Sequence, residues 1–297
     1  MPAASSSSPS LSAVVISRNE GALLRGTVHA LLGTLPRSAE VVVVDDASTD
    51  GSADFLGSSY PSVRLVRPPE RRGASAGRNL GARSARGDVL VFCDAHVLPP
   101  AGWVDPVCTA LEDPATGAVG VGVSVQGRPD LRGYGLTWTD AALNVAWLPR
   151  RGGGPYPVPV VGGFFLAMRR DVFAATGGFD DGILGWGGED RELCLRLWLL
   201  GHPCVMVPEV TVVHRFRATL PHALEPGALW HNLLRIGGVH FQRQRLARLL
   251  RCLTRLPDFS LGLARYLEGD GAVRRRRLSE LRAHDDDWYF ERFGLDL

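Results

Sequence analysis

A carboxylate and an imidazole two residues apart, Asp94 and His96, follow the apolar run 88–93 (DVLVFC). At a strand end such a pair can point to one side and hold a divalent cation; mixed oxygen and nitrogen ligands suit Mn²⁺, with Mg²⁺ as an alternative. A cation there can stabilise a departing phosphate. His214, which ends another apolar run, is a candidate third ligand, and Arg217 could bind phosphate. The alternative interpretation is a strand-end turn with a solvated histidine.

Two further segments have compositions suited to ligand binding. Asp45 and Asp46 follow the apolar run 41–44 and can accept hydrogen bonds from a nucleobase or from ribose hydroxyls, or one of them can cap the next helix. The stretch 73–81 (GASAGRNLG) allows close approach to a ligand, and Arg78 adds a forked donor for phosphate. The alternative for that stretch is a glycine-rich loop with an exposed arginine.

The segment 179–192 (FDDGILGWGGEDRE) combines a glycine-rich loop, one large aromatic residue and two adjacent acids. Trp186 offers a surface for sugar recognition, and Glu189 and Asp190 offer carboxylates for base catalysis at a helix start, where the dipole favours negative charge. A capped helix with a buried tryptophan is the structural alternative.

Strands and helices alternate over the first hundred residues. The apolar patterns predict strands at 12–17, 40–44, 63–66 and 88–93 and helices at 20–32 and 75–86. This alternation predicts an α/β fold with a parallel sheet, in which ligands bind at the carboxyl ends of the strands. Both polar clusters, Asp45–Asp46 and Asp94–His96, fall at such ends.

The remaining elements are less regular. We expect a helix at 101–112, a strand at 118–125, long loops with some helix that could form a lid at 126–158, a strand-like run at 158–168, an amphipathic helix at 191–200, short strands at 204–207 and 211–213, and helices beyond 228. The predicted organisation is a disordered lead-in (1–11), one catalytic domain (12–240) and a C-terminal helical extension (241–297).

The composition is that of a globular protein: 45% of the 297 residues are hydrophobic and 22% are charged. A net charge of +2 gives no signal for nucleic acid, and all basic residues are arginine because the sequence contains no lysine. Five cysteines without CxxC spacing predict free thiols in a reducing compartment. We expect neither a secretory signal nor a transmembrane helix, which favours a cytoplasmic protein.

Several stretches, in order, resemble the GT-A nucleotide-sugar glycosyltransferases of the family 2 type. They are VVVVDDASTDGS (41–52), GASAGRNLGARSARGDVLVFCDAH (73–96) and GGFFLAMRRDVFAATGGFDDGILGWGGED (162–190). The stretch WGGEDRELCLRLWLLGHPCVMVPEVTVVHRFR (186–217), followed by Pro221 and Asn232, is similar to the catalytic domain of polypeptide N-acetylgalactosaminyltransferases. The resemblance covers about residues 12–240. It implies a Rossmann-like GT-A fold, with a mostly parallel sheet flanked by helices.

The resemblance also implies roles for matching positions. The implied metal ligands, for Mn²⁺, are Asp94, His96 and His214. The implied donor contacts are Asp46 at uracil, Arg78 at the nucleotide, Gly162 and Gly163 at the sugar, and Arg217 with His222 at the diphosphate. Trp186 and Glu189 would contact sugar and acceptor.

Asp190 departs from the resembled family, which has asparagine there and retains the anomeric configuration. Inverting GT-A enzymes with a similar loop use this aspartate as the general base. Two mechanisms therefore stay open. Under inversion, Asp190 takes the proton of an acceptor hydroxyl or thiol; under retention, Asp190 only positions the acceptor and the leaving phosphate takes the proton.

The expected substrates are a UDP-sugar, such as UDP-GlcNAc, UDP-GalNAc or UDP-Glc, and a peptide, natural-product or lipid-linked acceptor. Since we expect neither a membrane anchor nor a lectin domain, a bacterial cytoplasmic enzyme is favoured over a secretory one. A nucleotidyltransferase is disfavoured because 17–20 (SRNE) stands where a glycine- and lysine-containing pyrophosphate loop is usual. A non-catalytic nucleotide-sugar-binding scaffold would not need the acids and histidines described above.

Two arginine-rich segments near the C-terminus could contact other molecules. Residues 243–256 have the spacing of a basic amphipathic helix, which either packs on the catalytic domain or lies on an anionic membrane surface. The run Arg274–Arg277 is either solvated or meets an acidic or lipid-phosphate acceptor.

Overall fold

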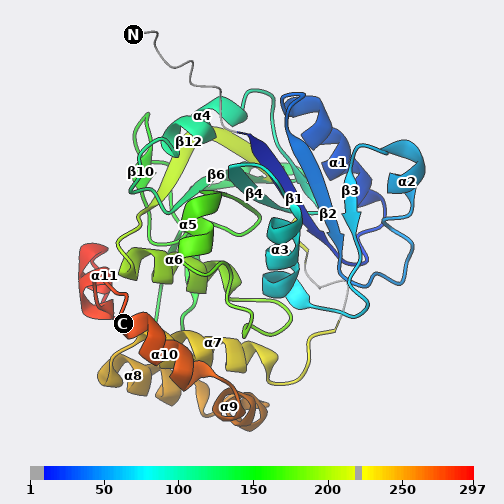
Figure 1. Cartoon of the computed structure of the whole chain (residues 1–297). Helices are drawn as coiled ribbons and strands as arrows, with labels where there is room; N and C mark the ends of the chain where they lie inside the picture. The colour runs from blue at the N-terminus through cyan, green and yellow to red at the C-terminus, as the bar shows by residue number, and fades with distance from the viewer. Residues whose placement is uncertain (1–9, 218–222) are drawn as a thin grey trace.

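The computed structural model describes residues 10–217 and 223–297 (Figure 1). The strands of its central sheet are β1 (Leu11–Ser17), β2 (Glu40–Asp45), β3 (Arg64–Val66), β4 (Val89–Asp94), β5 (Val97–Leu98), β6 (Ala118–Val125), β7 (Arg128–Gly133), β10 (Tyr156–Pro157), β11 (Phe165–Arg169) and β12 (Cys204–His214). Their order is β10-β12-β6-β11-β4-β1-β2-β3, with β5 added beside β12 and β7 beside β6. A separate hairpin consists of β8 (Leu136–Trp138) and β9 (Val145–Trp147).

The predicted parallel sheet is confirmed for the N-terminal half, where β1 pairs in parallel with β2 and β4, and β2 with β3. Beyond β4 the sheet is mixed, because β11 runs antiparallel to both of its neighbours while β12 and β6 are parallel. β1 begins at Leu11, so the predicted lead-in ends earlier than expected; residues 1–9 lie outside the described part of the chain.

Helices cover both faces of this sheet. They are α1 (Ala22–Thr34), α2 (Phe55–Ser59), α3 (Gly73–Ser84), α4 (Val104–Ala110), α5 (Arg170–Ala175), α6 (Glu189–Leu199), α7 (Ala228–His240), α8 (Arg243–Leu253), α9 (Phe259–Glu268), α10 (Gly271–Ser279) and α11 (Asp286–Arg292). Side chains alternate along β1: Ala13 and Val15 join a core with α1, α2 and α4, whereas Val14 joins the core that contains α3, α5 and α6. Both faces are therefore buried, as the uninterrupted apolar strands require.

Three expectations about the middle of the chain are wrong. Residues 128–157 contain four short strands and the described chain has no helix there, because β7 adds to the edge of β6 and β8 pairs with β9. In the run 158–168 only the part from Phe165 is strand. The two strands expected at 204–213 are one, β12, with an irregularity between Val207 and Thr211.

Helix α6 lies at the predicted place, but its predicted amphipathic character is wrong. Nine of its eleven residues are buried, including the charged Glu192 and Arg196. The Arg196 guanidinium donates to the Glu192 carboxylate through Nε (2.9 Å) and Nη2 (3.0 Å), and to the carbonyls of Thr176 and Gly178. A paired charge can thus occupy the position of an apolar side chain on the inner face of this helix.

Breaking this pair should strongly destabilise the fold. Removal of the Arg196 guanidinium leaves Glu192 with only Arg274 and His240 as partners. It also takes the donors from the carbonyls of Thr176 and Gly178, so we expect Arg196→Met to lower the free energy of unfolding by about 3 kcal/mol, the lower end for a broken buried pair. Arg128→Ala is the control, since Arg128 and Asp130 form an ion pair in which both side chains are 61% exposed. The control should leave the midpoint of urea unfolding almost unchanged. Equal midpoints of urea unfolding for the two variants would contradict the stabilising role of Arg196.

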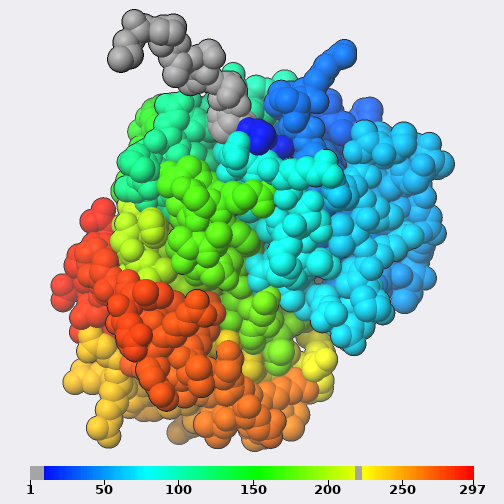
Figure 2. All heavy atoms as spheres, in the orientation of Figure 1, coloured from blue at the N-terminus to red at the C-terminus, as the bar shows by residue number. Residues whose placement is uncertain are grey.

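The C-terminal helices pack into the same core as the sheet. Leu249 and Leu253 of α8 belong to the buried cluster that contains Val14 and Leu193, and Figure 2 shows the orange and red C-terminal segment against the green segment before it. The leucine face of α8 is therefore covered by protein, which favours packing over the membrane interpretation. The domain boundary at residue 240 stays a prediction.

The run Arg274–Arg277 is solvated only in its second half. Arg274 forms ion pairs with Asp180 (Nε–Oδ2, 3.1 Å) and Glu192, and Arg275 donates to the backbone carbonyls of Gly238 and Phe241. Arg276 and Arg277 are exposed. All five cysteines are unpaired, as predicted. Among the described helices, none has the length and apolar character needed to cross a membrane.

Candidate active site

A cavity of about 700 Å³ opens at the carboxyl edge of the sheet. Its walls come from the ends of β1, β4 and β12, the start of α3, the hairpin of β8 and β9, the loop at Gly162–Phe164 and the loop from Gly185 to the start of α6. This is the edge at which the sequence places its polar clusters, and it is the usual ligand site of an open α/β sheet.

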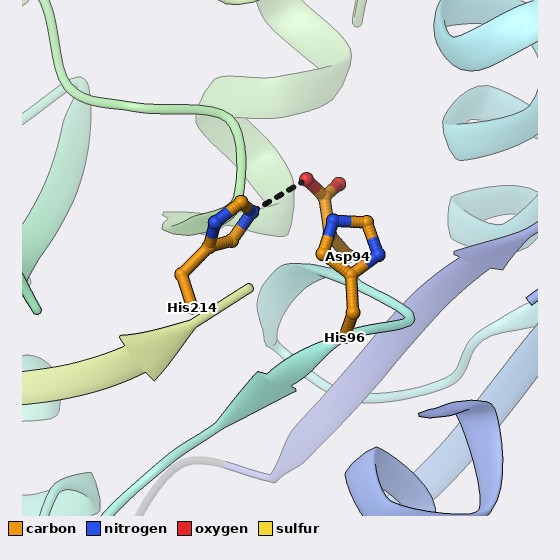
Figure 3. Close-up of side chains that lie close together, drawn as sticks. All are labelled: Asp94, His96 and His214. Atoms are coloured by element: carbon orange, nitrogen blue, oxygen red, sulfur yellow. Dashed lines mark ion pairs between the residues drawn. The ribbon is translucent and has the colours of Figure 1, made fainter. Parts of the chain in front are cut away.

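The predicted metal ligands meet in this cavity. Figure 3 shows Asp94, His96 and His214 pointing toward one another, and one ligand atom of each lies within 4.8 Å of the others. His214 is distant from His96 in sequence but lies beside it because β12 pairs with β5, which aligns His214 with Val97. Nε2 of His214 lies 3.6 Å from Oδ2 of Asp94. The sequence interpretation of these three side chains as one cluster is confirmed.

Electrostatics keep Asp94 ionised. Burial would raise the pKa of Asp94, but the bond to His214 and the charge of Arg78 hold it well below its usual range. Burial lowers the pKa of His96, yet the contact with Glu20 and the charge of Asp94 outweigh burial and raise it. Once His96 has lost its proton, the cluster offers an anionic oxygen and two imidazole nitrogens, the donor set expected for Mn²⁺.

Glu20, which the sequence analysis did not single out as a site residue, lies behind this cluster. Its Oε2 is 3.1 Å from Nδ1 of His96, and both of its carboxylate oxygens accept hydrogen bonds from the Arg217 guanidinium. Glu20 therefore orients one predicted metal ligand and one predicted phosphate-binding side chain. The sequence feature that could have identified Glu20 is its position, three residues after the end of β1 and therefore at the same edge of the sheet.

Arg78 lines the cavity, and its contact with the nucleotide stays a prediction. It is 2% exposed, and its Nη1 donates to Glu189 (2.9 Å) while Nη2 donates to Asp94 (2.8 Å) and to the carbonyl of Gly163 (3.2 Å). The alternative of an exposed arginine is wrong, and both terminal nitrogens serve protein oxygens rather than an open phosphate site. Arg78 instead joins the metal-binding group to the start of α6.

Asp45 and Asp46, at the end of β2, have side chains in different surroundings. Asp46 lines the cavity and accepts hydrogen bonds from the backbone N–H groups of Arg72 (2.5 Å) and Gly73 (3.0 Å), which fixes the entry to α3. Asp45 is not among the residues that line this cavity; it accepts from Nε of Arg67 (3.0 Å) and from the N–H of Ser48. Asp45 as a substrate contact therefore stays a prediction; its side chain does not reach this cavity because consecutive side chains at a strand end face opposite ways.

Asp190 is the carboxylate with the properties of a base. It lines the cavity, and its Oδ2 accepts from the N–H of Gly163 (3.0 Å) while Oδ1 accepts from the N–H of Arg191 (2.8 Å). Burial, followed by the charge of Glu189, raises the pKa of Asp190. A raised pKa strengthens a carboxylate as a proton acceptor. Glu189 is engaged otherwise, because it accepts from Arg78 and from the N–H of Gly187.

The other predicted substrate contacts lie around the same cavity. Gly162 and Gly163 line it opposite α6, and a side chain at position 163 would place its Cβ 3.1 Å from Cβ of Asp190. Trp186 lines the cavity and is 45% exposed, so the alternative of a buried tryptophan is wrong. Arg217 also lines it, next to Glu20. His222 lies outside the described residues.

A helix-flanked sheet with a DxH pair after β4 and a cavity at its carboxyl edge is the architecture of a GT-A glycosyltransferase. A family model described as "Glycosyl transferase family 2" matches residues 12–177, and one described as "N-terminal domain of galactosyltransferase" matches residues 153–219. The chain belongs to glycosyl transferase family 2.

Relatives and solved structures agree with this assignment. Polypeptide N-acetylgalactosaminyltransferase 6 of Mus musculus is 30% identical (95% of this chain, 49% of the relative), and polypeptide N-acetylgalactosaminyltransferase 11 of Xenopus tropicalis is 34% identical (78% and 42%). The chain spans about half the length of these curated relatives. The structure of GalNAc-T7 with UDP, GalNAc and Mn²⁺ superposes with a TM-score of 0.78 at 21% identity, covering 97% of this chain and 57% of that one. S. aureus TarS with UDP-GlcNAc gives 0.58 at 15% identity (92% and 83%).

Proposed function

We propose that the protein transfers a sugar from a UDP-sugar to an acceptor hydroxyl, with Asp190 as the base and with inversion at the anomeric carbon. The observation that carries this proposal is the meeting, in one cavity, of the metal-binding cluster and a partly buried carboxylate of raised pKa. The names of the relatives support a peptide acceptor, and the neighbouring structures with UDP or UDP-GlcNAc support the nucleotide.

The residues present fit a divalent cation. Asp94, His96 and His214 offer one oxygen and two ring nitrogens, and Nδ1 of the buried His214 has no hydrogen-bond partner among the described residues. When bound there, Mn²⁺ supplies positive charge that stabilises the diphosphate as it leaves. Mg²⁺ is the alternative ion.

The protein's own side chains perform the remaining steps. The acceptor O–H gives its proton to the Asp190 carboxylate while its oxygen attacks the anomeric carbon. The bond from that carbon to the phosphate oxygen breaks, and UDP leaves with the bonding electrons. The Arg217 guanidinium offers donors to the departing diphosphate, and Trp186 offers an aromatic face to a sugar ring.

Binding and product stereochemistry test the proposal. UDP with Mn²⁺ should raise the melting temperature, because a ligand at 100 times its Kd stabilises a folded protein by about 2.7 kcal/mol. Incubation with UDP-GlcNAc, UDP-GalNAc or UDP-Glc and serine- or threonine-containing peptides should give a β-linked product from the α-linked donor, as read by NMR. An α-linked product would contradict inversion. A thermal shift without transfer would favour the non-catalytic nucleotide-sugar-binding scaffold, and the absence of both would contradict the proposed donor site.

A further inference from the structure

The loop 184–188 carries Trp186 and leads into Asp190, yet its own sequence gives it little rigidity. Gly185, Gly187 and Gly188 all adopt positive φ (59°, 100° and 96°), a region that glycine enters freely and other residues rarely do. Because glycine also loses the most conformational freedom on ordering, contacts from outside must hold this loop.

Two of these contacts come from the catalytic side. The N–H of Ala74, in the first turn of α3, donates to the carbonyl of Gly185 (2.7 Å). The N–H of Gly187 donates to Oε2 of Glu189 (2.9 Å). The side of the loop that faces α7 is held by a third residue, Asn232, which does not line the cavity.

Asn232 is fully buried and all of its side-chain polar atoms bind this loop. Its Oδ1 accepts from the N–H of Leu184 (2.8 Å), and its Nδ2 donates to the carbonyls of Leu184 (2.9 Å) and Gly187 (2.9 Å). A longer contact joins Nδ2 to the carbonyl of Trp186 (3.4 Å). One carboxamide thus pairs four backbone groups that lie 45 to 48 positions earlier in the sequence, in the manner of a neighbouring strand.

Other residues of α7 contact the chain just before the loop 184–188, at positions 180 and 182. Nε2 of His231 lies 2.9 Å from the carbonyl oxygen of Gly182. The Arg235 guanidinium donates to both carboxylate oxygens of Asp180 (2.7 and 2.8 Å). Helix α7 therefore fixes the chain at 180, 182, 184 and 187, immediately before the catalytic end of α6.

We propose that Asn232 is a positioning residue for transfer, which holds the loop 184–188 so that Trp186 faces the cavity and Asp190 lies at the acceptor. The inference rests on the proposed function for the role of Asp190. Without the carboxamide, one N–H and three carbonyls of the loop lose their partners in a largely buried place, and the loop must open to satisfy them. Nucleotide and metal contacts come from other elements and should persist.

Asn232→Asp tests this role with minimal change of shape. The aspartate still accepts from the N–H of Leu184, but it sets a carboxylate oxygen, in place of a donor, against the carbonyl oxygens of Leu184, Trp186 and Gly187. We expect faster hydrogen exchange at 184–188, a fall in kcat of about 100-fold from misplacement of the reacting groups, and an unchanged thermal shift with UDP and Mn²⁺. If this variant does not fold, Asn232→Ser, which buries no charge, takes its place.

Trp230→Phe is the matched control on the same helix, because its Nε1 donates to the carbonyl of Pro257 (2.7 Å), away from the loop. This control should keep both the exchange pattern at 184–188 and kcat. Unchanged exchange and unchanged kcat in the Asn232 variant would overturn the proposal. Failure of the proposed function is distinguishable, since it would remove transfer from the wild type while the exchange measurement still reports on the loop.

Discussion

Replacing Asp190 by asparagine should lower the rate of sugar transfer by about 100- to 10,000-fold, the usual contribution of a positioned general base. The amide keeps the shape of the carboxylate and an oxygen that can accept from the N–H of Gly163, so the geometry at the start of α6 should survive. The variant loses the capacity to take a proton, together with the local hydrogen bond from the N–H of Arg191, which the amide nitrogen cannot accept. Initial rates of transfer at saturating donor, together with the affinity for UDP and Mn²⁺, separate chemistry from binding.

The pH profile gives an independent reading of the same group. Burial and the charge of Glu189 raise the pKa of Asp190, and the base must be ionised to act. In the wild type kcat/KM should therefore fall as the pH drops through that raised pKa, at a higher pH than for an ordinary aspartate. Asp105→Asn, an exposed change on α4, should keep both rate and profile. Near-normal turnover by Asp190→Asn would overturn the base assignment and favour a retaining mechanism.

The parallel half of the sheet was predictable because its strands are apolar on both faces and the intervening helices have helical spacing. Those local patterns fixed the strand ends, and the strand ends brought Asp94 near Asp46. The hairpins of the middle segment were not predictable in this way. β7 (RPDLRG) is polar and mostly exposed, and it is a strand because the edge of β6 pairs with it. Its hydrogen-bond partners, rather than its side chains, determine its conformation.

The details of the site depended on contacts distant in sequence. Arg78 matched a phosphate-binding pattern, but its partner Glu189 lies 111 positions away and turns the guanidinium inward. From the sequence there was no reason to prefer Asp45 or Asp46 as the ligand contact. Only the directions of their side chains at the end of β2 determine that Asp46 lines the cavity and Asp45 does not. Asn232 belonged to the family resemblance but had no role assigned, because its hydrogen-bond partners lie 45 to 48 positions away. Residue type therefore indicated which chemistry the site offers, while tertiary pairing determined which groups remain free to perform it.

Replacing His214 by alanine should abolish the Mn²⁺-dependent binding of UDP. The change leaves only Asp94 and His96 of the cluster. Loss of an outer partner of a metal ligand already costs about 10- to 100-fold in affinity, so loss of the ligand itself should weaken Mn²⁺ binding by more than about 100-fold. Titration of Mn²⁺ followed by the electron paramagnetic resonance of the free ion measures this directly. Chelation of the wild type with EDTA should reproduce the loss of UDP binding.

The His214 ring also packs against Phe216, with centroids 4.1 Å apart, so the variant must be separated from a packing defect. His214→Gln retains much of the bulk and should lose the metal as well, whereas the exposed His29→Ala on α1 should keep it. A melting temperature lowered without ligand, but still raised by UDP only when Mn²⁺ is present, would show that His214 serves packing alone. A nearly unchanged melting temperature without any Mn²⁺-dependent increase would identify it as a ligand, because the fold would then be intact while the ion no longer binds.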